Sequence, residues 1–343
     1  MTLVASWIRR TPAGEEMVIA SDSRLTGGIS LNHAPKLFRL ERQDAVIAYC
    51  GPTIVAYPLL LQVKASLDAH DETRSRILDI VHLKSHIEKV IESLRSTVAD
   101  LPSQDGTNRA FKFMLAGYSW KTSEFRIWTF RYDVRTGEFN AHSHRANSGD
   151  FMFMSDVARN EKNAVAALTR LVKQDQKGSL KRLDWQPLKI LVNVIRDASI
   201  PDIGGPVQLL KIYRHANTMP LNVIWPIEAE FNGGLPKKYE ITHLGRPLLG
   251  YERSRNLTLD PDTCQLLEPW NLQPYIDKLN KNEEKMELPK LYIKLCAAIG
   301  AARNKRAKSE RLSALIAAKV GFSQIKIVLN KIENEPFDSW YVQ

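Results

Sequence analysis

Strand-like and helix-like patterns alternate along this chain in blocks, and that order limits the possible folds more than any other feature. Short apolar runs typical of strands come first, at residues 3–8, 17–20, 37–40 and 45–50. Later segments follow as helices at 54–69 and 75–98, strands at 111–118, 125–132, 139–144 and 151–154, helices at 161–174 and 187–198, and strands at 207–213 and 221–225. Strand blocks separated by helix blocks predict an α+β fold with two sheets and two helical layers, rather than alternating βαβ units.

The composition is that of an ordinary folded protein. Of the 343 residues, 44% are hydrophobic and 25% are charged, which excludes a largely disordered chain. The three cysteines, Cys50, Cys264 and Cys296, are odd in number and far apart, so we expect neither a disulfide framework nor a CxxC metal site. No apolar run approaches the roughly 18 residues of a membrane span, and the N-terminus lacks a signal-peptide pattern. We therefore expect a cytoplasmic protein without a membrane segment.

The composition changes near residue 250. Three prolines, Pro261, Pro269 and Pro274, punctuate a linker-like stretch, and the chain beyond them is rich in Lys, Ala and Leu. We predict two domains, residues 1–250 and a basic, mainly helical C-terminal extension at 251–343. The whole chain carries 48 Lys+Arg and 38 Asp+Glu, a net charge of +10, while residues 303–331 hold eight basic residues and one acidic residue, a net of +7. Most of the positive surplus therefore lies in the extension.

Thr2 follows the initiator methionine directly, and methionine aminopeptidases remove Met1 when the next residue is small. A terminal threonine carries a nucleophile and a base in one residue, because its α-amine can take the proton of its own hydroxyl. The ordinary pKa of an α-amine is about 7.7 to 8.0, close to the value at which a general base works best. Removal of Met1 would therefore create a complete nucleophile at Thr2.

A series of short motifs follows Thr2. They are Val18-Ile19-Ala20-Ser21-Asp22-Ser23-Arg24, then Leu25-Thr26-Gly27-Gly28, then Lys36-Leu37-Phe38, then Ile47-Ala48-Tyr49-Cys50-Gly51. In order and approximate spacing this series resembles the threonine peptidases of the proteasome β-subunit superfamily, which are N-terminal-nucleophile (Ntn) hydrolases, and most closely the bacterial HslV-like and Anbu-like ring proteins. The resemblance covers roughly residues 2–215. It implies a four-layer αββα sandwich, no cofactor, a peptide or protein substrate, and a homo-oligomeric ring or related assembly.

The resemblance also implies roles for individual residues. Thr2 would be the nucleophile, Lys36 would stabilise its alkoxide, Asp22 would neutralise and orient Lys36, and the Gly51 N–H would stabilise the oxyanion. Backbone groups of Thr26 and Gly51 would hold an extended substrate as an added strand. An apolar, aromatic-lined pocket before the scissile bond would be formed by Leu25, Ala34, Phe38, Tyr49 and Thr53.

Two further residues are implied by weaker downstream matches. Asn147-Ser148-Gly149 resembles the family's turn whose serine approaches the terminal amine, so Ser148 would take that role. Arg196-Asp197 and Gly204-Gly205 resemble the family's Arg-Asp-x-x-Ser-Gly-Gly segment, so Asp197 would be a partner of the amine. Here three extra residues, 200–202, separate the aspartate from the glycines, and Ile203 stands where that family has serine.

Other features favour plainer interpretations or a different function. His82 and His86, and also His142 and His144, lack a third ligand or the glutamate of an HExxH motif, so we expect no metal site. Residues 303–331 resemble a helix-turn-helix preceded by basic residues, although a plain helical hairpin fits them better. The leading interpretation is a threonine-type peptidase or amide hydrolase acting through an acyl-Thr2 intermediate. The alternative is an inactive proteasome-like assembly protein, or a nucleic-acid-binding protein that uses residues 303–331.

Overall fold

The computed structural model describes residues 1–26, 29–95, 111–133, 138–174, 183–227, 238–249 and 256–281. The chain divides into two compact units, one formed by Met1–Trp225 and Ile241–Pro269 and the other by Pro226–Glu240 and Trp270–Gln343. All of the predicted site residues belong to the first unit. Residues 303–331, and with them the helix-turn-helix interpretation, lie outside the described residues.

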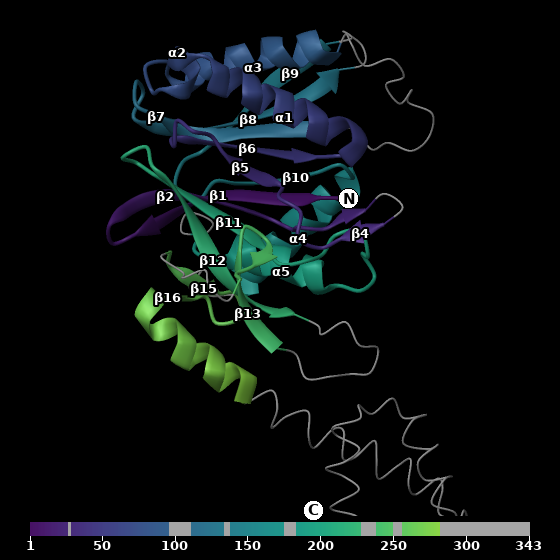
Figure 1. Cartoon of the computed structure of the whole chain (residues 1–343), viewed down its shortest axis with the longest axis vertical. Coiled ribbons are helices and arrows are strands. Elements are labelled where there is room, and N and C mark those ends of the chain that lie inside the picture. Colours follow the sequence, from purple (N-terminus) through teal and green to yellow (C-terminus); the bar gives the residue numbers. More distant parts are fainter. Residues whose placement is uncertain are drawn as a thin grey trace, which may run out of the picture. The chain divides into compact units, whose positions relative to one another are not determined.

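A nine-stranded sheet contains the N-terminus (Figure 1). Its strand order is β10-β1-β2-β11-β12-β13-β14, with β15 beside β12 and β16 beside β15. The strands are β1 (Leu3–Thr11), β2 (Gly14–Ser21), β10 (Phe151–Ser155), β11 (Gln208–Tyr213), β12 (Thr218–Ile227), β13 (Lys238–His243), β14 (Arg246–Pro247), β15 (Thr258–Asp260) and β16 (Gln265–Leu267). Because β1 lies between β10 and β2 and is antiparallel to both, the residues at its start meet the ends of those two strands.

A second sheet has five antiparallel strands in the order β5-β6-β7-β8-β9. They are β5 (Leu37–Arg39), β6 (Ala45–Cys50), β7 (Lys112–Ser119), β8 (Glu124–Asp133) and β9 (Glu138–His144). A separate two-stranded ribbon pairs β3 (Leu25–Thr26) with β4 (Ser30–Leu31). This ribbon immediately follows Asp22-Ser23-Arg24, the motif expected beside Thr2.

The helices flank the two sheets in Figure 1. They are α1 (Thr53–Ala69), α2 (Asp71–Arg74), α3 (Ile80–Arg95), α4 (Ala158–Gln174) and α5 (Gln186–Arg196). A short 3-10 turn, η2, spans Pro269–Asn271, and in the second unit residues 272–281 are helical. None of the helices among the described residues is long and apolar enough to cross a membrane.

Three apolar clusters explain why the central strands are buried on both faces. Along β1, Leu3, Ala5 and Trp7 join a cluster with α4 and α5, whereas Val4 and Ile8 join a cluster shared with the five-stranded sheet. The third cluster packs the opposite face of the five-stranded sheet against α1 and α3. Strands covered on both sides lose the strict apolar–polar alternation of a half-exposed strand, which accounts for the continuous run at residues 3–8.

The structure is a mixed α and β fold with a large, mainly antiparallel sheet, in agreement with the predicted strand and helix blocks. The boundaries differ where the pattern is weak: residues 75–98 were expected to form one helix, and the helix starts at Ile80 instead. Asp79 accounts for that start, because its carboxylate accepts the backbone N–H of Val81 at 2.9 Å. The short strands β13–β16 carry no clear sequence pattern and were not expected.

Candidate active site

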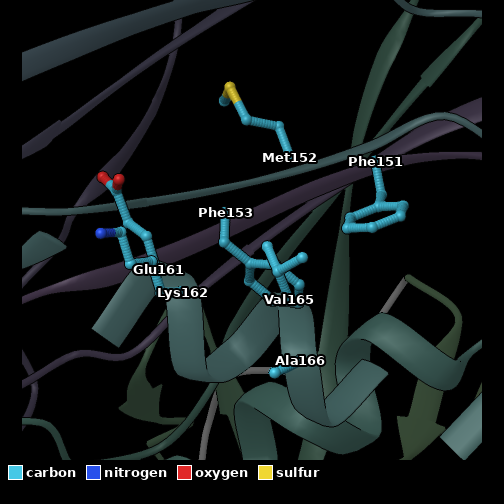
Figure 2. A pocket seen from close by; sticks show the side chains of 7 residues that line it. All are labelled: Phe151, Met152, Phe153, Glu161, Lys162, Val165 and Ala166. Atoms are coloured by element: carbon cyan, nitrogen blue, oxygen red, sulfur yellow. The ribbon is translucent and has the colours of Figure 1, made fainter. Parts of the chain in front are cut away.

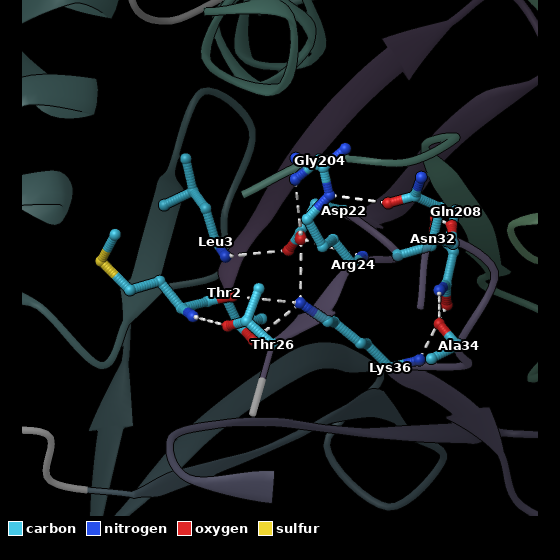
Figure 3. Close-up of polar contacts among 12 residues, drawn as sticks. Thr2, Leu3, Asp22, Arg24, Thr26, Asn32, Ala34, Lys36, Gly204 and Gln208 are labelled. Carbon is cyan, nitrogen blue, oxygen red and sulfur yellow. Dashed lines mark hydrogen bonds and ion pairs between the residues drawn. The ribbon is translucent and has the colours of Figure 1, made fainter. Parts of the chain in front are cut away.

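Thr2 is buried at the start of β1, and only 3% of its surface is exposed. Figure 3 shows Thr2 among the polar contacts that surround it. The register of the sheet sets its neighbours. Val4 pairs with Ser21, the last residue of β2, and Leu3 pairs with Ser155, the last residue of β10. The residues just after these two strand ends, Asp22 and Asp156, therefore lie on either side of Thr2.

Lys36 connects the threonine hydroxyl to the carboxylate of Asp22. Its Nζ lies 2.9 Å from Thr2 Oγ1 and 2.8 Å from Asp22 Oδ2, and it also donates to the Met1 carbonyl oxygen at 3.3 Å. The side chains of Lys36 and Asp22 are both fully buried. A buried ammonium needs such a partner, because an unpaired charge would be strongly destabilising in this interior.

Asp22 is held by backbone as well as by Lys36. Its carboxylate accepts the N–H groups of Leu3 at 3.2 Å, Arg24 at 3.3 Å and Gly204 at 3.3 Å. A Cβ at residue 204 would lie 2.4 Å from the guanidinium carbon of Arg24, so a larger residue there would displace the end of the Arg24 side chain. The charge-assisted bonds fix the carboxylate that orients the lysine.

A buried glutamine on β11 fixes the backbone on which Lys36 stands. Gln208 Oε1 accepts the N–H of Lys36 at 3.0 Å and that of Leu37 at 3.1 Å, while Nε2 donates to the Ala34 carbonyl at 2.6 Å. All three backbone groups belong to the turn that leads into β5. Sequence analysis did not single out Gln208, since it lies more than 170 residues from the turn that it holds.

Gly51 lies beside Thr2 in a small cavity of about 20 Å³. The cavity is lined by Met1, Thr2, Arg24, Leu25, Thr26, Gly51, Pro52, Thr53 and Asp156. Gly51 has φ +125°, in a region that side chains rarely adopt, and a Cβ there would lie 2.5 Å from the backbone of Phe111. Only glycine therefore fits at this corner between β6 and α1.

Met1 forms part of the wall of that cavity. Its amine donates to Thr26 Oγ1 at 3.4 Å, and its sulfur accepts from Asn160 Nδ2 at 3.6 Å. Burial lowers the pKa of the Met1 amine; the carboxylate of Asp156 opposes that effect and the charge of Lys36 adds to it. While Met1 is attached, the nitrogen of Thr2 is an amide and cannot act as a base.

The predicted pocket residues divide into three groups. Leu25 and Thr53 line the cavity beside Thr2. Phe38 and Tyr49 pack together at a ring-centroid distance of 6.4 Å, next to Tyr57, within the apolar cluster that includes α1. Ala34, by contrast, is buried in the turn before Lys36 and bonded through its backbone to Gln208 and Ser23.

Ser148 and Asp197 are not brought to Thr2. Ser148 lies in the turn before β10, whose Asp150 carbonyl bonds the N–H of Ile8, far along β1 from Thr2. Asp197 is exposed after α5, where its carboxylate accepts the N–H of Ser199. A side-chain hydrogen bond from Ser199, with this backbone contact adding to it, lowers the pKa of Asp197.

Two residues that sequence analysis missed lie near Thr2. Asp156 Oδ1 accepts the backbone N–H of Thr2 at 3.0 Å, and Ser155 Oγ lies 3.4 Å from the same oxygen. Both side chains are buried. The predicted strand at 151–154 was the signal that could have located them. A residue that follows this strand lies at the start of β1, whereas Ser148 precedes the strand and lies at its other end.

A larger cavity of about 460 Å³ opens between β10 and α4 (Figure 2). It is lined by Phe151, Met152, Phe153, Glu161, Lys162, Val165 and Ala166. Its carboxylate, Glu161, is already bonded to Lys112 and to the N–H of Ser155. The lining therefore presents mainly apolar side chains.

The described residues contain no group of three or more His, Cys, Asp or Glu side chains that could hold a metal ion. His82 and His86 lie on α3, and His86 packs edge-on against His70. On β9, His144 Nε2 is 2.8 Å from Thr129 Oγ1. These histidines stay apart from the Thr2 site.

Comparisons with known proteins give a structural likeness only. No family model matches the chain, and no curated protein matches it. The structure is similar to that of an Anbu (Gly-1) mutant from Hyphomicrobium sp. strain MC1, with 16% sequence identity over 64% of this chain and 85% of the other, at a TM-score of 0.44. At this identity and TM-score the likeness does not assign a function.

Proposed function

We propose that this chain is an N-terminal threonine hydrolase, which cleaves a peptide or amide bond through an acyl-Thr2 intermediate once Met1 has been removed. The observation that carries the proposal is the fully buried Lys36 Nζ, which lies within 3 Å of both Thr2 Oγ1 and Asp22 Oδ2. Burying a lysine ammonium costs desolvation free energy. Placed beside a hydroxyl at a small cavity, the ammonium can stabilise the negative charge of an oxygen nucleophile.

The proposed reaction uses groups that are already in place. Because Lys36 donates to Oγ1, the hydroxyl proton of Thr2 is free to point toward a base. The liberated α-amine of Thr2 takes that proton while Oγ1 attacks the substrate carbonyl carbon, and the ammonium of Lys36 stabilises the negative charge on Oγ1 as it develops. Asp22 pairs with the Lys36 ammonium and orients it.

The tetrahedral intermediate then collapses. The carbonyl oxygen carries the negative charge next to the backbone of Gly51, whose N–H we assign as the oxyanion donor. The bond between the carbonyl carbon and the leaving nitrogen breaks, the amine returns the proton to that nitrogen, and an ester on Thr2 remains. The same amine then takes a proton from water as the water oxygen attacks the ester carbonyl carbon. The bond from that carbon to Oγ1 breaks, Oγ1 regains the proton from the amine, and the acid product leaves a free Thr2.

Some parts of the proposal rest on the resemblance to proteasome-like peptidases. They are the assignment of the two sheets and their flanking helices to the αββα Ntn sandwich, the binding of an extended peptide or protein substrate along Thr26 and Gly51, a homo-oligomeric ring or related assembly, and a cytoplasmic location. No cofactor is assigned. The division into a hydrolase domain at 1–250 and a C-terminal extension at 251–343 also remains a prediction.

An intact-mass measurement with active-site labelling tests the function. We expect purified protein to lack Met1 and to gain the mass of one threonine-directed electrophile per chain. Thr2→Ala and Lys36→Ala should each abolish labelling, whereas Lys64→Ala, which removes a lysine paired with Asp68 on the surface of α1, should label like the wild type. Complete retention of Met1, or equal labelling of the Thr2→Ala variant, would refute the proposal.

A substitution at Gly51 tests the oxyanion assignment separately. Gly51→Ala places a Cβ against Phe111 at a backbone angle that favours glycine, so the loop must shift its N–H. Loss of one oxyanion donor typically slows acylation by about 10²–10³-fold. Unchanged acylation in a Gly51→Ala protein that still folds would remove Gly51 from this role.

A further inference from the structure

The nitrogen of Thr2 has a carboxylate partner that the family motifs do not predict. Asp156 Oδ1 lies 3.0 Å from Thr2 N, in a site where 3% of Thr2 and 4% of Asp156 are exposed. In the present chain this contact is an amide-to-carboxylate hydrogen bond. After Met1 is removed, the same nitrogen becomes the α-amine that the proposed function uses as its base.

The backbone just before Asp156 is held by Lys112 and Glu161. Lys112 Nζ donates to the carbonyl of Ser155 at 2.8 Å and to Glu161 Oε1 at 2.6 Å, and the same Glu161 oxygen accepts the N–H of Ser155 at 2.8 Å. This clamp joins β7, β10 and α4 at the residue before Asp156. Glu161 also lines the cavity between β10 and α4 (Figure 2).

We propose that Asp156 is the positioning residue that holds the Thr2 α-amine and stabilises its protonated form during the attack. The inference rests on the proposed function, because the amine exists only after Met1 is removed. A carboxylate at hydrogen-bond distance accepts a hydrogen bond from one amine N–H and thereby fixes the direction of the nitrogen lone pair. An aspartate that orients and supports a histidine base in serine hydrolases acts in the same way.

The charges around the N-terminus are known for the Met1 amine. Burial and the charge of Lys36 favour the neutral form of that amine, whereas Asp156, Asp202 and Asp22 favour its protonated form. The Thr2 amine would meet the same charged groups. Arg24 lines the same cavity but bonds Asn32 and the Pro201 carbonyl. Among these carboxylates, Asp22 already pairs with Lys36. Asp156 is the one that touches the nitrogen, so its removal should alter the amine most.

Asp156→Asn is the informative variant, because the amide oxygen can still accept a hydrogen bond while the charge is lost. We expect the pKa of the Thr2 amine to fall by about one pH unit or more, as loss of an adjacent opposite charge requires. The acid limb of the labelling profile should move to lower pH by the same amount. A weaker base also transfers protons less readily, so the plateau rate should fall by up to about tenfold.

The experiment uses full-length protein released from a cleavable N-terminal fusion so that Thr2 is the first residue. The amine pKa is measured from the pH dependence of its acetylation, followed by mass spectrometry, and the labelling rate of Oγ1 is measured over the same pH range. Asp197→Asn, which alters the carboxylate implied by the family motif, is the comparison. Chemical denaturation checks that each variant is folded.

The outcomes separate the two proposals. A lower amine pKa in Asp156→Asn, with the Asp197→Asn protein matching the wild type, supports the inference. An unchanged amine pKa in Asp156→Asn, or a shift seen only in Asp197→Asn, overturns it. If the amine pKa falls in Asp156→Asn but wild-type Thr2 is labelled at no pH, Asp156 holds the amine as inferred and the proposed hydrolase function fails.

Discussion

Separating the ion pair at the centre of the site should have a large and specific energetic signature. Lys36 Nζ and Asp22 Oδ2 are 2.8 Å apart and both side chains are fully buried. At an effective dielectric constant of about 20, two unit charges at that distance attract by roughly 6 kcal/mol. Desolvation cancels much of this, and removing one partner of a buried pair typically costs about 3–5 kcal/mol.

Lys36→Met keeps most of the side-chain volume and leaves the Asp22 charge without its cation. Three backbone N–H groups, from Leu3, Arg24 and Gly204, still bond the carboxylate, so we expect a loss near the lower end, about 3 kcal/mol in the free energy of unfolding. Asp22→Asn removes the charge that neutralises Lys36 and should cost a similar amount. Urea denaturation of both variants gives these values.

The double variant tests whether the charges of Lys36 and Asp22 are energetically coupled. With Lys36→Met and Asp22→Asn together, no unpaired charge remains, so the loss should be smaller than the sum of the two single losses by about 2 kcal/mol or more. Lys64→Met, at the partly exposed pair with Asp68, is the matched control and should change stability by less than about 0.5 kcal/mol. Single losses that add within about 0.5 kcal/mol would show that the two charges are not coupled.

Three other variants test features of the same fold. Gln208→Ala leaves the turn before β5 without its three side-chain bonds and should lower the free energy of unfolding by at least about 2 kcal/mol in urea denaturation. Tyr49→Phe should be neutral or stabilising by up to about 1 kcal/mol, because the buried Tyr49 hydroxyl has no hydrogen-bond partner among the described residues; a clear loss would reveal one. Burial, with nearby positive charge adding to it, lowers the pKa of His144 below 6.5, so the unfolded chain binds more protons just under that pH. His144→Asn should therefore lose less thermal stability than the wild type between about pH 7 and pH 5, and an identical loss would exclude this residue as a cause.

The motifs near the N-terminus were sufficient for the part of the site built from nearby residues. Asp22 follows one strand pattern and Lys36, 14 residues later, precedes another, and the resemblance of these motifs to proteasome-like peptidases is what placed the two side chains together. Gly51 follows the strongest strand pattern and precedes a helix. The structure brings all three to Thr2, together with Leu25 and Thr53.

The part of the site that is distant from Thr2 in sequence depends on strand direction, which no local motif specifies. Because β10 is antiparallel to β1, its end and not its beginning lies at Thr2. A serine before the strand therefore falls at the wrong end for a contact, while Ser155 and Asp156 fall beside Thr2. The partners are 154 residues apart, so the sequence alone cannot pair them without the register of the sheet.

The segment before the paired glycines also departs from its sequence pattern. The Gly204 N–H donates to Asp22, and the motif predicts a glycine there, but the extra residues 200–202 change which side chains precede it. Asp197 is exposed to solvent, and Asp202 is the carboxylate from this loop whose charge acts on the Met1 amine. The sequence cannot place either aspartate, because a loop, unlike a strand, has no fixed register.

With Met1 attached, the proposed nucleophile is in place but the proposed base is not. The Thr2 hydroxyl already has its lysine at 2.9 Å, and that lysine has its carboxylate at 2.8 Å, so the nucleophile and its electrostatic support form with Met1 in place. The base does not form, since the Thr2 nitrogen remains an amide bonded to Asp156. Removal of Met1 would free the nitrogen at a position that Asp156 already contacts, and would also take away one wall of the cavity beside Gly51. Under the proposed function, activation therefore requires hydrolysis of the Met1–Thr2 peptide bond and no rearrangement of the sheet.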